Sequence, residues 1–191
     1  MIEVIAKIKG ISPMGQSRAI QSKRDTGEGP DDHEERTWKE RLHTDENGVA
    51  VIPPMAIKNC LADCAKYLSE SVPGKGKSTY TKHFEAGILC LEPASLGIKA
   101  KDVQGTKLHV PSDGIKGGAK RVYRYFPTIP TGWEAECHIT VMDPILISKP
   151  EKIHEYFVHA GKFIGLGCFR PRRGGFWGRF TVESFKTKNI D

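Results

Sequence analysis

The sequence lacks any long apolar run. No stretch of about eighteen apolar residues occurs, and no charged-then-apolar start leads to a small-residue cleavage site, so we expect neither a membrane span nor a secretory signal. The five cysteines are scattered, and no two are separated by just two residues, the spacing of many metal sites. We therefore expect a soluble cytoplasmic protein with reduced thiols, no bound metal and no cofactor.

A phosphate-binding P-loop is also missing. Residues 73–82 contain glycine, lysine, serine and threonine, but not in the order glycine, four residues, glycine, lysine, serine or threonine. The segment also follows a predicted helix, whereas a P-loop follows a strand. We exclude nucleotide binding of this kind and interpret 73–84 as a flexible basic loop.

The charge of the chain is divided very unevenly. Residues 25–46 hold nine carboxylates against three basic side chains, which makes this segment −6. Because the whole chain is +6, the other 169 residues carry +12. A strongly basic body with one acidic segment attracts polyanions.

The basic residues gather near glycines, most densely in 162–180, which contains five glycines, four arginines and several aromatic rings. Glycines allow close backbone approach, arginines bind phosphates, and exposed rings stack on unpaired bases. This mixture predicts binding to single-stranded nucleic acid, with a further basic cluster formed by Lys116 and its neighbours. The candidate contacts are Lys75, Lys77, Lys82, Lys120, Arg121, Arg124, Lys162, Phe169, Arg170, Arg172, Arg173, Phe176, Trp177 and Arg179.

The aromatic residues of this segment have a second interpretation. In a simple glycine-rich turn between the last helix and the last strand, Phe176 and Phe180 would belong to the core. Trp177 is open to the same choice. If the Trp177 ring faces the bound nucleic acid, replacing Trp177 weakens binding. If the ring belongs to the core, replacing Trp177 lowers the melting temperature instead.

Hydrophobic periodicity predicts one α+β domain over 1–191. Residues 12–47 are predicted to be a mobile charged insertion that ends in a short helical piece at 34–42, and 94–119 are predicted to be basic and irregular. A turn at 127–132 is predicted to join the two strands beside it into a hairpin. The predicted strands are 2–9, 49–52, 87–92, 121–126, 134–141 and 178–185, and the predicted helices are 53–71 and 150–164.

Without its insertions the chain reads strand, helix, strand, strand, helix, strand, which is the split βαβ order of ferredoxin-like and RNA-recognition (RRM-like) domains. The segment between the second helix and the last strand resembles the glycine-rich loop of the RAMP superfamily of CRISPR proteins, most closely that of its backbone subunit. The residues that carry the resemblance are Gly165-Leu-Gly167, Arg170, Gly174, Gly175 and Gly178-Arg179-Phe180.

This resemblance implies a ferredoxin-like palm with large insertions, whose copies stack along a guide RNA into a filament. It favours a protein that binds single-stranded RNA or DNA without sequence preference, as a homo-oligomer or together with CRISPR effector subunits, and not at a membrane. The chain is shorter than is typical of the family and also resembles small phage proteins. A bacterial or a phage origin is therefore open, as is a phage protein that imitates a backbone subunit to act on host complexes.

The acidic segment adds two alternatives. It can meet the basic body of the next copy in a head-to-tail contact. Alternatively, Asp31, Asp32, His33 and Glu35 can hold a divalent metal or act as base in a ribonuclease, since some backbone subunits of the resembled family cut RNA from an aspartate in a comparable loop. Adjacent side chains of an extended segment point to opposite faces, which disfavours joint chelation.

Overall fold

The computed structural model describes residues 1–112, 114 and 120–190. Its main sheet has four antiparallel strands in the order β4 (Ile88–Leu89), β8 (Glu134–Val141), β1 (Ile2–Gly10) and β9 (Phe180–Asn189). In the chain, helix α2 (Pro54–Leu68) lies between β1 and β4, and α5 (Pro150–His159) lies between β8 and β9. This is the predicted α+β, split βαβ arrangement.

The core lies between one face of this sheet and its helices. Along β1 the even-numbered side chains from Ile2 to Ile8 are buried, while Lys7 and Lys9 are exposed on the other face. Helix α2 begins after Pro53 and buries Ile57 and Leu61 against the sheet, and α5 continues through a π-helical turn, Ala160–Ile164. The period-two alternation of β1 and the helical spacing of α2 therefore predicted the buried face of each element correctly.

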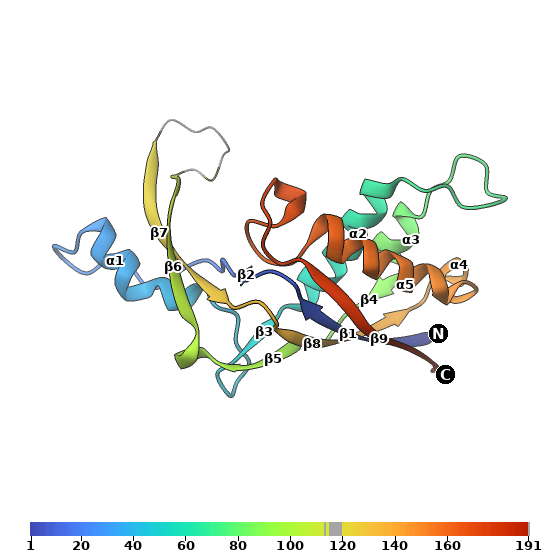
Figure 1. Cartoon of the computed structure of the whole chain (residues 1–191), viewed down its shortest axis with the longest axis horizontal. Coiled ribbons are helices and arrows are strands. Elements are labelled where there is room, and N and C mark those ends of the chain that lie inside the picture. Colours follow the sequence, from blue (N-terminus) through green and yellow to red (C-terminus); the bar gives the residue numbers. More distant parts are fainter. Residues whose placement is uncertain (113, 115–119, 191) are drawn as a thin grey trace.

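A second, three-stranded sheet forms an arm that projects from the main body (Figure 1). We define the arm as β6 (Gln104–Pro111) and β7 (Arg121–Ile129), and the short strand β2 (Met14–Gly15) pairs with the base of β7. The predicted hairpin between 121–126 and 134–141 is therefore wrong, because β7 pairs with β6 whereas β8 pairs with β1. Between β7 and β8 the chain passes from the second sheet to the main sheet and does not form a hairpin.

Residues 94–119 are also more regular than predicted. They form β5 (Ala94–Lys99), a 3-10 turn (Ala100–Asp102) and β6, while the end of the segment, including Lys116, lies outside the described residues. Strand β5 pairs with β3 (Val49–Ile52). Because β6 has no fully buried face, its side chains show no clean alternation of apolar and polar residues, which is why periodicity missed it.

The charged insertion is folded against the arm and is not a free loop. Helix α1 covers Pro30–Thr37, four residues earlier than the predicted start at 34, and a 3-10 turn follows at Trp38–Arg41. Arg41 forms a buried ion pair with Glu34 at 2.8 Å, and Glu34 also accepts a hydrogen bond from the backbone N–H of Tyr125 on β7. This buried, hydrogen-bonded ion pair attaches the helical part of the insertion to the arm, whereas most of residues 17–29 are exposed and without helix or strand.

The remaining helices are short. Helix α3 (Thr81–Ala86) takes in the end of the predicted loop 73–84, so only its first part is irregular, and α4 is Pro144–Ile147. Phe84, inside α3, is fully buried, and this burial stabilises a helix that the basic composition of the segment did not suggest. None of the described helices is long and apolar enough to cross a membrane.

Candidate nucleic-acid interface

The glycine-rich loop, residues 165–179, is folded back on itself and docked onto β2. Leu166 donates a backbone hydrogen bond to the carbonyl of Gly178, and Trp177 donates one to the carbonyl of Phe169. Cys168 donates to the carbonyl of Gly15, which fastens the loop to β2. The loop is therefore a rigid feature with a defined outer surface.

Its glycines are required by this internal packing. A β-carbon at position 178 would lie 1.8 Å from the carbonyl oxygen of Leu166, and one at position 175 would lie 1.9 Å from that of Phe169. Gly178 also has φ of +72°, a conformation that favours glycine. Close approach of the loop to itself accounts for Gly175 and Gly178, so no bound strand is needed to explain them.

The structure separates the three predicted stacking residues. Trp177 is only 8% exposed, and its ring meets the edge of Phe169 at 5.3 Å, so it offers no platform for a base. Phe169 is half-buried, held between Trp177 and Phe126. Phe176, by contrast, is 65% exposed. The buried position of Trp177 therefore argues against the predicted stacking on bases and favours the core interpretation of its ring.

The four arginines of the loop also differ. Arg170 pairs with Asp63 of α2 at 3.1 Å, and Arg179 donates to the carbonyl of Lys162, so both have protein partners. Arg172 and Arg173 lie on a 3-10 turn, Pro171–Arg173, and both are exposed. They remain the candidates for phosphate contacts in this loop.

The other predicted basic residues fall in two distant places. Arg121 is exposed on the arm, with Lys120 just before it, whereas Arg124 is half-buried and donates to the carbonyl of Ser112. Lys75 and Lys77 are exposed in the loop before α3 and Lys82 within α3 itself, at the end of the molecule opposite the arm (Figure 1). The structure does not bring these three lysines together with the arm.

Sequence reasoning missed an aromatic stripe on one face of the arm, which we define as His109, Tyr123, Tyr125 and Trp38. His109 stacks on Tyr123 at 4.8 Å between ring centroids, and Trp38 stacks on Tyr125 at 6.3 Å. The Lys107 ammonium lies 5.4 Å from the Tyr123 centroid and 5.2 Å from that of Tyr125. Tyr123 is 53% exposed.

The signal for this stripe was the alternation within two segments. In β7 the odd positions 121, 123 and 125 carry an arginine and two tyrosines, and in β6 the odd positions 107 and 109 carry a lysine and a histidine. Lys107 lies opposite Tyr125 and His109 opposite Tyr123 in the register. The two rows meet only because the strands pair, and β6 was not predicted as a strand.

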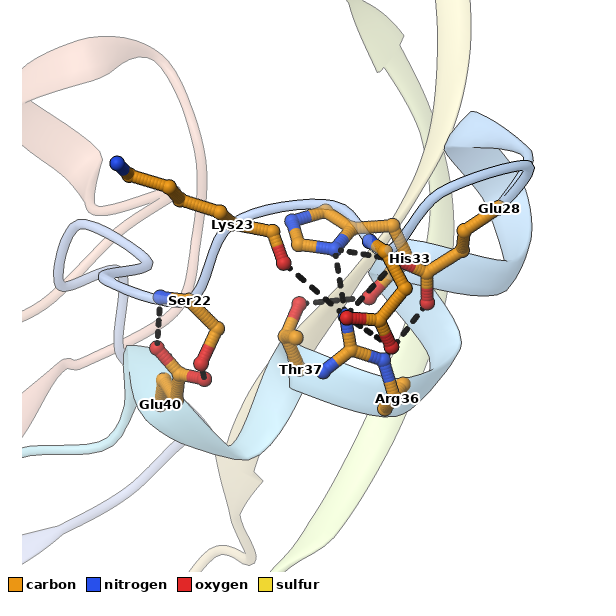
Figure 2. Close-up of polar contacts among 8 residues, drawn as sticks. Ser22, Lys23, Glu28, His33, Arg36, Thr37 and Glu40 are labelled. Atoms are coloured by element: carbon orange, nitrogen blue, oxygen red, sulfur yellow. Dashed lines mark hydrogen bonds and ion pairs between the residues drawn. The ribbon is translucent and has the colours of Figure 1, made fainter.

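The acidic segment forms a polar cluster around Glu28, His33 and Arg36 (Figure 2). Arg36 donates to both carboxylate oxygens of Glu28, at 2.7 and 2.8 Å, and the His33 ring lies 3.2 Å from the same carboxylate. Asp31 and Asp32 are exposed in the first turn of α1. His33 therefore faces Glu28, and the described residues contain no group of three or more side chains placed to hold a metal ion.

The cluster predicts a specific pH dependence. The Arg36 guanidinium and the backbone N–H of Asp25 bind the Glu28 carboxylate and lower its pKa from 4.5 to about 2. A carboxyl group whose folded-state pKa is depressed stabilises the fold above pH 4.5, and the contribution disappears as the pH falls toward 2. Denaturant unfolding of Glu28→Gln should show lower stability than wild type at pH 7 and a gap that narrows below pH 4.5.

Arg36→Gln is the matched control, since it removes the partner and keeps the carboxylate. Its stability gap should follow the same pH profile. A gap for Glu28→Gln that stays constant from pH 7 down to pH 3 would contradict the assignment of Glu28 as the titrating group.

Comparison with known proteins identifies the fold. No protein-family model matches the sequence, and no curated protein matches it either. Among solved structures, one chain of a Type III-B Cmr-beta complex bound to cognate target RNA superposes with a TM-score of 0.55 and 13% identity over 97% of this chain. Cmr6 from Pyrococcus furiosus superposes with a TM-score of 0.50 and 14% identity, covering 95% of this chain and 99% of that one.

The chain therefore has a fold similar to that of subunits of Type III-B Cmr complexes, and the predicted resemblance is confirmed at the level of the fold. It spans 60% of the length of the matched Cmr-beta chain. At sequence identities of 13% and 14%, the superpositions show the fold alone. The binding properties of this chain are therefore argued from its own residues.

Proposed function

We propose that this chain binds single-stranded nucleic acid, RNA in the first instance, without sequence preference, and assembles along the strand as a backbone-like subunit. The aromatic stripe carries the proposal. His109 and Tyr123 are exposed and stack on each other, Trp38 and Tyr125 form a second, half-buried pair, and the Lys107 ammonium lies against both tyrosines. Bases of any sequence stack on such rings, because every base has a π-face.

The stripe and the glycine-rich loop are linked through β2 but lie on opposite faces of the arm, because Phe126 contacts Phe169 of the loop whereas the adjacent Tyr125 contacts Trp38. Gly15 of β2 pairs with Thr128 of the arm on one side and with Cys168 of the loop on the other. Figure 1 shows the arm and the loop rising from the same side of the main sheet. We propose that a nucleic-acid strand stacked on the stripe continues around the arm to Arg172 and Arg173, which are exposed on the loop and available to its phosphates.

The face of the main sheet does not take this role. In RNA-recognition domains the open sheet carries the stacking aromatics. Here the open face presents Lys7 paired with Glu136, and Lys9 paired with Glu134. These opposite charges neutralise one another, and the imidazole of this face, His138, lies against Glu3 and Glu136, which favours the arm as the site of stacking.

RNA is the preferred strand because the Cmr-beta structure is described as bound to target RNA. Assembly along the strand is supported by the division of charge, with −6 on residues 25–46 and +12 on the rest. An acidic surface on one copy and a basic surface on the next favour a head-to-tail contact, which repeats indefinitely unless it closes into a ring.

The salt dependence of binding tests the phosphate contacts. The slope of log affinity against log salt should be steep for wild type and fall by about 1.4 in Arg172→Ala/Arg173→Ala, at about 0.7 per phosphate contact on a single strand. Fluorescence anisotropy of a labelled single-stranded RNA at several KCl concentrations measures it.

Lys75→Ala/Lys77→Ala removes the same charge at the other end of the molecule and should leave the slope unchanged. Equal reductions in both double variants would mean a nonspecific effect of net charge. A wild-type affinity that does not respond to salt would overturn the proposal. If a folded sample bound neither RNA nor DNA, the chain would act through protein partners.

A further inference from the structure

A cavity of about 210 Å³ lies where β2, the first turn of α2 and the glycine-rich loop meet. Its apolar lining includes Met14, Ile52 and Ala56, and its polar lining includes Ser17 and His43. Gly167 and Cys168 of the loop close one side. The cavity is therefore lined partly by the glycine-rich loop, to which the proposed function assigns contacts with nucleic acid.

The polar groups of the cavity are available to a ligand. Gln16 is already used, because its amide nitrogen donates to the carbonyl of Val51 and its amide oxygen accepts from the backbone N–H of His43. No hydrogen bond among the described residues involves the Ser17 hydroxyl or the His43 ring. Two uncommitted polar side chains beside apolar walls form the usual pattern of a small-molecule site.

Partial burial favours the neutral form of the His43 ring. Removal from water lowers the pKa of His43, and the nearby Arg18 charge lowers it further. A neutral imidazole presents one donor and one acceptor nitrogen, and the Ser17 hydroxyl can do both. Together they match a heterocycle whose edge alternates donors and acceptors.

The size and the surrounding charge narrow the ligand class. Drug-sized ligands occupy pockets of about 300 to 1,000 Å³, so a cavity near 210 Å³ suits one small ring system. Arg18 is exposed, directly follows Ser17 of the cavity lining in the chain, and forms no ion pair with any described residue. A guanidinium beside a small, partly apolar cavity favours a ligand with one ring and one attached anion.

We propose that this cavity takes a single unstacked nucleobase, with Ser17 and His43 against its edge and its phosphate at Arg18. The inference rests on the proposed function, which it deepens: the arm stacks several bases, while the cavity receives one base turned out of the stack. Because the base would occupy the cavity, binding at this site should require a base in addition to a phosphate.

Titration of ¹⁵N-labelled protein with adenosine 5′-monophosphate, and in parallel with ribose 5-phosphate, tests this directly. The nucleotide should shift the amide signals of Ser17, Ala56 and Gly167, and ribose 5-phosphate should not. Equal shifts with both probes would show a phosphate site only and overturn the base pocket. No shifts at these amides with either probe would also overturn it.

Ala56→Phe fills the cavity from the partly exposed first turn of α2 and should weaken nucleotide binding by about tenfold or more, as loss of one well-seated ring does. Met55→Phe adds a ring at the neighbouring position, which is 56% exposed, and should leave nucleotide binding unchanged. Equal losses in both variants would contradict the cavity. Should Ala56→Phe fail to fold, Ser17→Ala at an exposed position should still weaken nucleotide binding severalfold.

The two proposals fail in different ways. Salt-sensitive binding of RNA strands together with no response to the nucleotide would leave the proposed function standing and remove the pocket. Absence of strand binding in wild type would remove the proposed function whatever the nucleotide does.

Discussion

Replacing Trp177 by alanine is expected to lower the melting temperature by about 6 to 20 °C. A buried tryptophan replaced by alanine costs about 3–5 kcal/mol, and a domain of this size loses about 2–4 °C per kcal/mol. The Trp177 ring is 8% exposed and packs edge-on against Phe169. It also covers Gly15, where an added β-carbon would lie 2.6 Å from it. Thermal unfolding followed by circular dichroism measures the change.

Phe176→Ala is the matched control for this prediction. The side chain is next in sequence and 65% exposed, so its loss should leave the melting temperature within about 1–2 °C of wild type, as exposed substitutions change stability by about 0.5 kcal/mol or less. If Trp177→Ala kept the wild-type melting temperature and lost RNA binding instead, the ring would be a base platform and its buried position in the loop would be wrong.

Removing two rings of the aromatic stripe is expected to weaken RNA binding by at least about 30-fold. Each base stacked on an aromatic side chain contributes about 1–3 kcal/mol, so Tyr123→Ala/His109→Ala removes about 2 kcal/mol or more. Both side chains are exposed, so the melting temperature should change little. Anisotropy titrations with labelled single-stranded RNA at one fixed salt concentration measure the loss.

Another exposed ring pair provides the control. Tyr67 and Phe163 stack at 5.6 Å and are 52% and 41% exposed, but they lie on α2 and on the turn after α5. Tyr67→Ala/Phe163→Ala should leave RNA binding within about twofold of wild type, since rings that lie away from the arm are not expected to stack on the bound bases. Similar losses in the two double variants would show that the arm is not the specific site.

Several parts of the fold follow from local pattern. The strand at residues 2–9 alternates buried and exposed side chains, and the structure has β1 at Ile2–Gly10. The helix predicted from 53 to 71 is α2 at Pro54–Leu68, where two prolines fix the start. These predictions succeeded because each element buries one face, so burial is written into the spacing of its own residues.

Other parts depend on which segments meet. The hairpin predicted for β7 and β8 was wrong because both segments read as strands and only pairing energies across the whole chain select β6 as the partner of β7. The environment of Trp177 likewise depends on distant contacts, since Phe169 meets its ring edge-on and Gly15 lies against it.

The sequence by itself determined the α+β class, the strands and helices of the main sheet, the basic body with its acidic segment, and the glycine-rich loop that resembles the RAMP superfamily. Tertiary structure alone decided which charges and rings remain available. Arg170 is bound to Asp63, 107 positions away, whereas Arg172 and Arg173 are exposed. The aromatic stripe exists only because β6 pairs with β7 and Trp38 packs beside them. Local spacing shows which face of an element is buried, but the partner that covers or pairs a given side chain comes from a distant part of the chain, which local spacing does not specify.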